Sequence, residues 1–196
     1  MRKLYCVLFW VIITPAQALD LTPDGISLAY GEDIDTGVVM TDTRISLRWN
    51  WDHGFFQLQN WDATGYIDVS ASFLKSNANP EKVLITHLPS SDKAEVYAVS
   101  PVFRFISTGY HDIQPFIDLG IGGAWFSDYH LEREGNTRQR LGGRGQFEIR
   151  AGGGILLGPE KNLELGYRII HYSNASIHDI NMGLNFHMLT LGYWFK

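Results

Sequence analysis

The stretch that decides the fold is Asn162-Leu-Glu-Leu-Gly-Tyr-Arg-Ile-Ile-His171, near the C-terminus. Its apolar residues fall at every second position, and polar or small residues fill the positions between them, with Leu163, Leu165, Tyr167 and Ile169 on one face and Glu164, Gly166 and Arg168 on the other. A period of two predicts a β-strand rather than a helix. His171 and Ser173 continue the apolar parity, so a candidate base and a candidate nucleophile would face lipid if the apolar face does.

Seven further segments alternate in the same way, and we predict strands at 25–32, 43–51, 61–74, 95–106, 113–125, 146–157 and 186–196. Pro101, inside the fourth strand, predicts a bulge or an irregular edge. Long polar stretches at 76–93, 127–142 and 174–183 predict loops, and short turns are expected at 108–112 and 158–162. An even number of strands of about ten residues, with long loops alternating with short turns, is typical of an outer-membrane barrel. The predicted fold is all-β, an eight-stranded antiparallel transmembrane β-barrel.

The second face of these strands carries charges of both signs: Arg44, Arg48, Arg104, Arg150, Arg168, Asp68, Asp118, Glu148 and Glu164. Inside a barrel of eight strands, side chains fill the interior and such charges can pair with one another. A water-soluble sandwich fits the same parity, with the apolar face as its core and the charges in solvent. The terminal Tyr-Trp-Phe run favours the barrel, because aromatic residues gather at membrane interfaces.

The N-terminus has the pattern of a secretory signal peptide. Arg2 and Lys3 precede an apolar run from 4 to 13, and Ala16-Gln-Ala18 matches a cleavage signal, so we expect residues 1–18 to be removed. Residues 19–196 would form a single domain. The sole cysteine, Cys6, lies in the expected signal peptide, so the mature chain would have no disulfide.

Charge and histidine placement argue against several partners. Removing Arg2 and Lys3 from 16 basic residues leaves 14 against 21 acidic ones, without a basic cluster, which argues against nucleic acid. The histidines outside the opening stretch are scattered without metal-ligand spacing, so we expect no metal site. No phosphate-binding loop is present, and we expect no cofactor.

The C-terminal half resembles the lipid A 3-O-deacylase family. The resemblance rests on His171-Tyr-Ser-Asn-Ala175 followed by Asn181-x-Gly183, together with Pro101-Val-Phe-Arg104, Pro115-Phe-Ile-Asp-Leu-Gly-Ile-Gly122 and Glu164-Leu-Gly-Tyr-Arg168. It implies a multi-pass barrel in the outer membrane and a lipid-facing active site. The implied activity is an esterase that removes the 3-O-linked acyl chain of lipid A, the lipid part of lipopolysaccharide, without a cofactor. Outer-membrane lipid would surround the protein. The resemblance leaves open whether the protein forms a homodimer.

By position, the resemblance implies that His171 is the general base and Ser173 the nucleophile. Asn174, Ser176 and Asn181 fall where the family forms its oxyanion hole, although the family has Gly where this chain has Ser176. A positive φ at that position would suit Gly better than Ser.

The third member of the triad departs from the family, because an acid is expected fourteen residues after the histidine and this chain has Asn185. Three interpretations stay open. Asn185 orients His171 in a slow enzyme, Asp179 in the preceding loop supplies the charge, or the chain is an inactive structural barrel or adhesin.

Overall fold

The computed structural model describes residues 21–35, 37–51, 54–84, 89–109, 112–135 and 138–195. The expected signal peptide, residues 1–18, lies outside these ranges, and its cleavage stays a prediction. No helix among the described residues is both long and apolar enough to cross a membrane.

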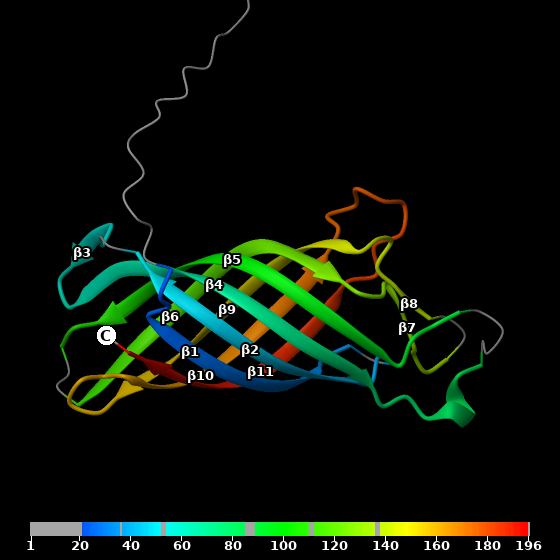
Figure 1. Ribbon diagram of the computed structural model, residues 1–196, viewed down its shortest axis with the longest axis horizontal. Coiled ribbons are helices and arrows are strands. Elements are labelled where there is room, and N and C mark those ends of the chain that lie inside the picture. The colour runs from blue at the N-terminus through cyan, green and yellow to red at the C-terminus, as the bar shows by residue number, and fades with distance from the viewer. Residues whose placement is uncertain are drawn as a thin grey trace, which may run out of the picture.

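Eight long strands of the described chain form one closed antiparallel barrel (Figure 1). They are β1 (Gly25–Asp33), β2 (Met40–Asn50), β4 (Trp61–Ser76), β5 (Lys93–Ser107), β6 (Ile113–Phe126), β9 (Gly145–Leu157), β10 (Leu163–Ser173) and β11 (Leu184–Trp194). Each strand pairs with its neighbour in sequence, and β1 pairs with β11 to close the ring. The predicted fold class and all eight predicted strands are confirmed.

The shorter elements were not predicted from the sequence. Strand β3 (Phe56–Leu58) extends the sheet beside β4, and the hairpin of β7 (His130–Leu131) and β8 (Gln139–Arg140) lies in the second long loop. One short 3-10 turn, η1 (Pro80–Lys82), lies in the described part of the first long loop. These elements have two or three residues each, too few to show a period.

Pro101 does not create the expected bulge. The pairing of β5 with β6 has the same register at Val99↔Gly123 and at Val102↔Gly120, so no residue is inserted between them. The partner strand on the other side, β4, pairs through Pro101 without interruption. Proline lacks an N–H, so here it removes a backbone hydrogen bond between the strands and does not change their register.

The two faces predicted from the sequence are the outer and inner faces of the barrel. In β10, Leu165 and Ile169 are more than 40% exposed, whereas Glu164 and Arg168 between them are buried. The same alternation runs through the other long strands, so the exterior is an apolar surface, whereas the interior holds the charged residues together with two apolar clusters, one around Phe186 and one around Tyr66. An apolar exterior on a closed barrel is the surface that lipid chains cover.

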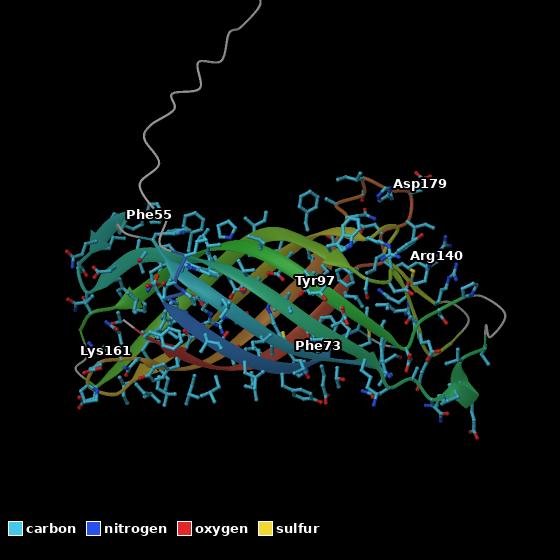
Figure 2. The ribbon with its side chains drawn as sticks, in the orientation of Figure 1. Phe55, Phe73, Tyr97, Arg140, Lys161 and Asp179 are labelled. Atoms are coloured by element: carbon cyan, nitrogen blue, oxygen red, sulfur yellow. The ribbon has the colours of Figure 1, made fainter. Side chains whose placement is uncertain are left out.

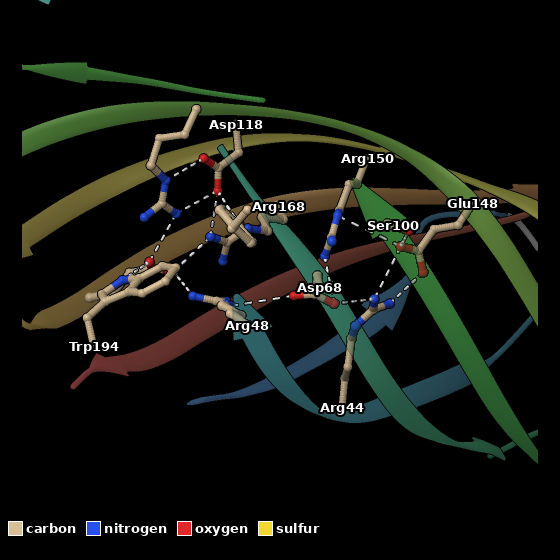
Figure 3. A network of polar contacts seen from close by, with 12 residues as sticks. Arg44, Arg48, Asp68, Ser100, Asp118, Glu148, Arg150, Arg168 and Trp194 are labelled. Carbon is tan, nitrogen blue, oxygen red and sulfur yellow. Dashed lines mark hydrogen bonds and ion pairs between the residues drawn. The ribbon is translucent and has the colours of Figure 1, made fainter. Parts of the chain in front are cut away.

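The interior charges form one connected network (Figure 3). Asp118 accepts hydrogen bonds of 2.8 Å from Arg104 and from Arg168. Further along the barrel, Arg44 lies 2.7 Å from Glu148 and 3.2 Å from Asp68. Breaking a buried ion pair leaves an uncompensated charge, so each member is held by its partners.

Glu164 is the most highly connected carboxylate of this network. Its two oxygens lie 2.9 Å from Arg48, 3.0 Å from Arg104 and 2.8 Å from Arg168, and one of them accepts a 2.9 Å hydrogen bond from the Trp194 indole. Glu164 therefore ties β10 to strands β2, β5 and β11 across the interior.

The two ends of the barrel differ. Short turns link β5 to β6 and β9 to β10 at the end where the C-terminus lies, and the long loops gather at the opposite end (Figure 1). Figure 2 places Lys161 at the first end and Asp179 and Arg140 at the loop end. In barrels of this class the short turns face the periplasm and the long loops face outward.

Replacing Glu164 with Gln should lower the free energy of unfolding by about 3–5 kcal/mol, because three arginines lose their shared negative partner. Urea titration of the barrel in detergent micelles, followed by tryptophan fluorescence, measures this loss. The control is Glu160→Gln, an exposed carboxylate in the turn before β10, which should change stability by less than about 0.5 kcal/mol. Equal stability of the two variants would contradict a structural role for the network.

Candidate active site

His171 and Asn185 are direct cross-strand partners on β10 and β11. Nδ1 of His171 lies 2.7 Å from Oδ1 of Asn185, which is hydrogen-bond distance. Both residues share the parity of the outward-facing apolar residues, and both side chains are half-buried. The amide at position 185 thus occupies the place from which an acid would orient the imidazole.

Ser173 is the last residue of β10, two positions beyond His171 and on the same face. The rise along a strand puts the two Cβ atoms about 6–7 Å apart, a gap that a serine and an imidazole can bridge. Ser173 pairs across the ladder with Phe147 of β9. The base and nucleophile expected from the sequence therefore lie side by side where the strand meets the loop.

Asn174 holds the loop that follows. Its backbone N–H donates to Oδ1 of Asn181 at 2.9 Å, and its side-chain amide donates to the carbonyls of Leu141 and Ile180 at 2.8 and 2.7 Å. All three of its N–H donors are therefore used within the protein. The hydrogen bond from the Asn174 backbone also sets the orientation of the Asn181 side chain. Because the amide oxygen of Asn181 faces Asn174, its NH₂ group points away from Asn174.

The backbone after Asn174 is left-handed. Ala175 has φ of 50° and Ser176 has φ of 62°, values that non-glycine residues seldom adopt. The positive φ considered for position 176 is therefore present, and a Gly there would take this conformation at lower cost. Ser176 is exposed.

Gly183 leaves room for the imidazole. A Cβ at this position would lie 2.9 Å from Cε1 of His171 and 2.9 Å from the carbonyl oxygen of Tyr172. The carbonyl of Gly183 accepts a 2.6 Å hydrogen bond from Gln139, so the β7–β8 hairpin holds the segment against His171. His171, Gly183, Asn185 and Gln139 line an open cavity of about 470 Å³ at the loop end.

Two acidic residues are candidates for the negative charge that Asn185 does not supply. Asp179 is exposed in the loop between β10 and β11, where Figure 2 labels it. Asp35, which the sequence reasoning missed, lies just after β1, and its carboxylate accepts hydrogen bonds of 3.1 and 2.9 Å from the Asn185 amide. Among the described residues, no three His, Cys, Asp or Glu side chains could hold a metal ion.

A groove of about 590 Å³ runs over the outer surface and reaches Asn174, the residue after Ser173, and Phe147, the cross-strand partner of Ser173. Gly123 and Gly145 form open positions in it, because a Cβ on either would meet no atom within 4 Å. The aromatic residues Tyr97, Trp125 and Phe147 line it, together with the loop residues Asn174, Ile177 and His178.

Replacing Gly183 with Ala should lower the kcat of the ester hydrolysis that the resemblance implies by about 10²-fold, because the methyl group pushes the His171 ring aside. The matched control is Gly109→Ala, whose Cβ would make an ordinary 3.6 Å contact in a distant turn. Release of fatty acid from purified lipid A in micelles gives the rates. Full activity of the Gly183 variant would contradict the crowding inferred here.

Comparison with known proteins agrees with this geometry. The family model of lipid A 3-O-deacylase (PagL) matches residues 39–194. The lipid A deacylase PagL of Pseudomonas aeruginosa is 31% identical over 181 residues, which cover 91% of this chain and 88% of that protein. A crystal structure of the outer membrane enzyme PagL superposes with a TM-score of 0.68 and 28% identity, covering 86% of this chain and 98% of that one. The chain belongs to the lipid A 3-O-deacylase family and is an outer-membrane β-barrel.

Proposed function

We propose that this protein is an esterase that removes the 3-O-linked acyl chain of lipid A, with Ser173 and His171 at a site that faces lipid. The observation that carries the proposal is the outward-facing cross-strand pair of His171 and Asn185, with Ser173 two residues along the same face. Membership of the family supports the substrate. No cofactor is required for this chemistry.

In the proposed reaction, Nε2 of His171 accepts the proton of Ser173 as its Oγ attacks the acyl carbonyl. The bond between the acyl carbon and the sugar oxygen then breaks, and the imidazolium gives its proton to that oxygen, which leaves as the sugar hydroxyl. Water, deprotonated by the same nitrogen, attacks the acyl-enzyme. The bond from the acyl carbon to Oγ breaks, Ser173 takes the proton back from His171, and the fatty acid is released. Asn185 keeps the ring in place throughout, through the 2.7 Å contact at Nδ1.

The oxyanion needs N–H donors that are not already used. Asn181 is the best-supported donor, because its oxygen is taken by the Asn174 backbone and its NH₂ group points elsewhere. We assign Asn174 the role of fixing Asn181 and the loop. The backbone N–H of Ser176, where the chain is left-handed, is the second donor that we propose for the oxyanion.

The groove beside Ser173 suits the acyl chain of a lipid. A row of paired residues runs across the barrel wall from Ser173 through Phe147 and Gly123 to Val99. Three interstrand steps cover about 14 Å. An acyl chain lying along this row would pass over the open position at Gly123, with its ester at Ser173.

Replacing Ser173 with Ala, or His171 with Asn, should lower turnover by more than about 10³-fold, since each removes a reacting group. His187→Asn is the matched control, because His187 lies two residues beyond Asn185 on the same outward face. Mass spectrometry of lipid A from cells that express each form should show loss of one 3-hydroxyacyl chain only with both reacting groups present.

Unchanged lipid A in cells with folded wild-type protein in the outer membrane would refute the esterase and favour a structural barrel or adhesin. Full turnover in the Ser173 variant would keep the activity but refute the assigned nucleophile.

Replacing Gly123 with Phe should fill the groove and lower kcat/KM by about 10- to 100-fold, because part of the acyl chain loses its place. The fold should persist, since a Cβ at this position meets no atom within 4 Å. Leu191→Phe, on the outer face of β11, serves as the control for added bulk. Equal kcat/KM for the two variants would place the acyl chain elsewhere.

A further inference from the structure

We infer that Asp35 is a positioning residue that fixes the tautomer of His171 through the side-chain amide of Asn185. The inference rests on the proposed Ser173–His171 mechanism. It gives a physical reason why an amide can stand at the position where the family has an acid.

The geometry is a chain of three side chains. Nδ1 of His171 lies 2.7 Å from Oδ1 of Asn185, and Nδ2 of Asn185 lies 3.1 and 2.9 Å from the two carboxylate oxygens of Asp35. All three side chains are half-buried and line the same cavity of about 470 Å³. The amide therefore bridges an imidazole and a carboxylate.

The donors and acceptors allow only one arrangement. A carboxylate accepts hydrogen bonds and donates none, so the amide must turn its NH₂ toward Asp35. Its oxygen then faces His171, and an oxygen accepts only from a protonated Nδ1. The proton is thus kept on Nδ1, and the lone pair on Nε2 is left free for Ser173.

An amide without Asp35 has no such preference. It can present its NH₂ to Nδ1, which stabilises the tautomer whose proton is on Nε2 and cannot serve as base. In a serine triad this wrong tautomer costs about 10⁴-fold in kcat. Asp35 excludes it and also adds a negative charge one amide beyond the imidazole.

The backbone holds Asp35 at this place. Strand β1 pairs with β11, and the N–H of Ile34 donates to the carbonyl of Asn185 at 2.9 Å, one step beyond the paired residues. The next residue is Asp35, whose own carbonyl accepts from the N–H of Val38 at 3.3 Å. The turn after β1 is thus fastened to the residue that Asp35 contacts.

The experiment compares four forms in the full-length barrel: wild type, Asp35→Asn, Asn185→Glu and the double variant. Asp35→Asn should lower kcat by about 10²- to 10³-fold with little change in KM, because the new amide can donate to Asn185 and turn it around. In the double variant, the carboxylate introduced at position 185 accepts from His171 directly, and kcat should return to within about tenfold of wild type. Glu32→Gln, an exposed carboxylate near the end of β1, is the control and should keep wild-type kcat.

The second measurement is the ¹⁵N spectrum of the His171 ring in micelles, assigned with the His171→Asn variant. Wild type should show a proton on Nδ1, and Asp35→Asn should shift the ring toward the Nε2-protonated form. A purely structural role for Asp35 would leave this signature unchanged in folded protein.

Unchanged kcat and tautomer in Asp35→Asn would overturn the inference, as would a loss of kcat in the double variant equal to that in Asp35→Asn alone. Loss of turnover in Asp179→Ala but not in Asp35→Asn would move the charge to the loop and also overturn it. Failure of the proposed function is distinct, since it appears as wild-type protein without Ser173-dependent turnover. The tautomer measurement decides the role of Asp35 in that case too.

Discussion

The pairing of buried arginines with buried carboxylates is the constraint on which this structure depends. A barrel that presents Leu, Ile and aromatic side chains to lipid has to place its polar residues inside, where little water can solvate them. Arg44, Arg48, Arg104, Arg150 and Arg168 meet that demand by sharing Asp68, Asp118, Glu148 and Glu164. Some of these pairs cross the interior between strands that are distant in the chain, such as Arg44 with Glu148 and Arg48 with Glu164, and they brace the wall.

Rigidity of the wall explains how the proposed site can stand at its outer rim. His171 and Asn185 lie opposite each other in a ladder whose register the interior charges and the apolar exterior both fix. The loop after Ser173 has no such ladder, and it relies on Asn174, Gln139 and Asn181 to hold its shape. The site thus combines two strand residues with a loop held by amide hydrogen bonds.

Much of this could be predicted from the sequence because a period of two is a strong signal in strands of ten residues. Parity placed Glu164 and Arg168 inside and His171 outside, and the family resemblance pointed to Asn185 as the residue beside His171. Asp35 was missed because its contact with Asn185 joins residues 150 positions apart. One signal was available: a closed barrel must pair its first strand with its last, which brings the end of β1 beside the start of β11. The short strands β3, β7 and β8 carry too few residues for any pattern.

The seam between β1 and β11 gives the site a dependence on assembly. The hairpin of β10 and β11 can bring His171 to Asn185 while the rest of the chain is still unfolded, but Asp35 reaches Asn185 only once the first strand has joined the last. A chain whose first and last strands have not yet paired therefore lacks the contact between Asp35 and Asn185. In the proposed mechanism, full hydrolytic competence would therefore arise only when the ring closes, which ties activity to assembly in the membrane.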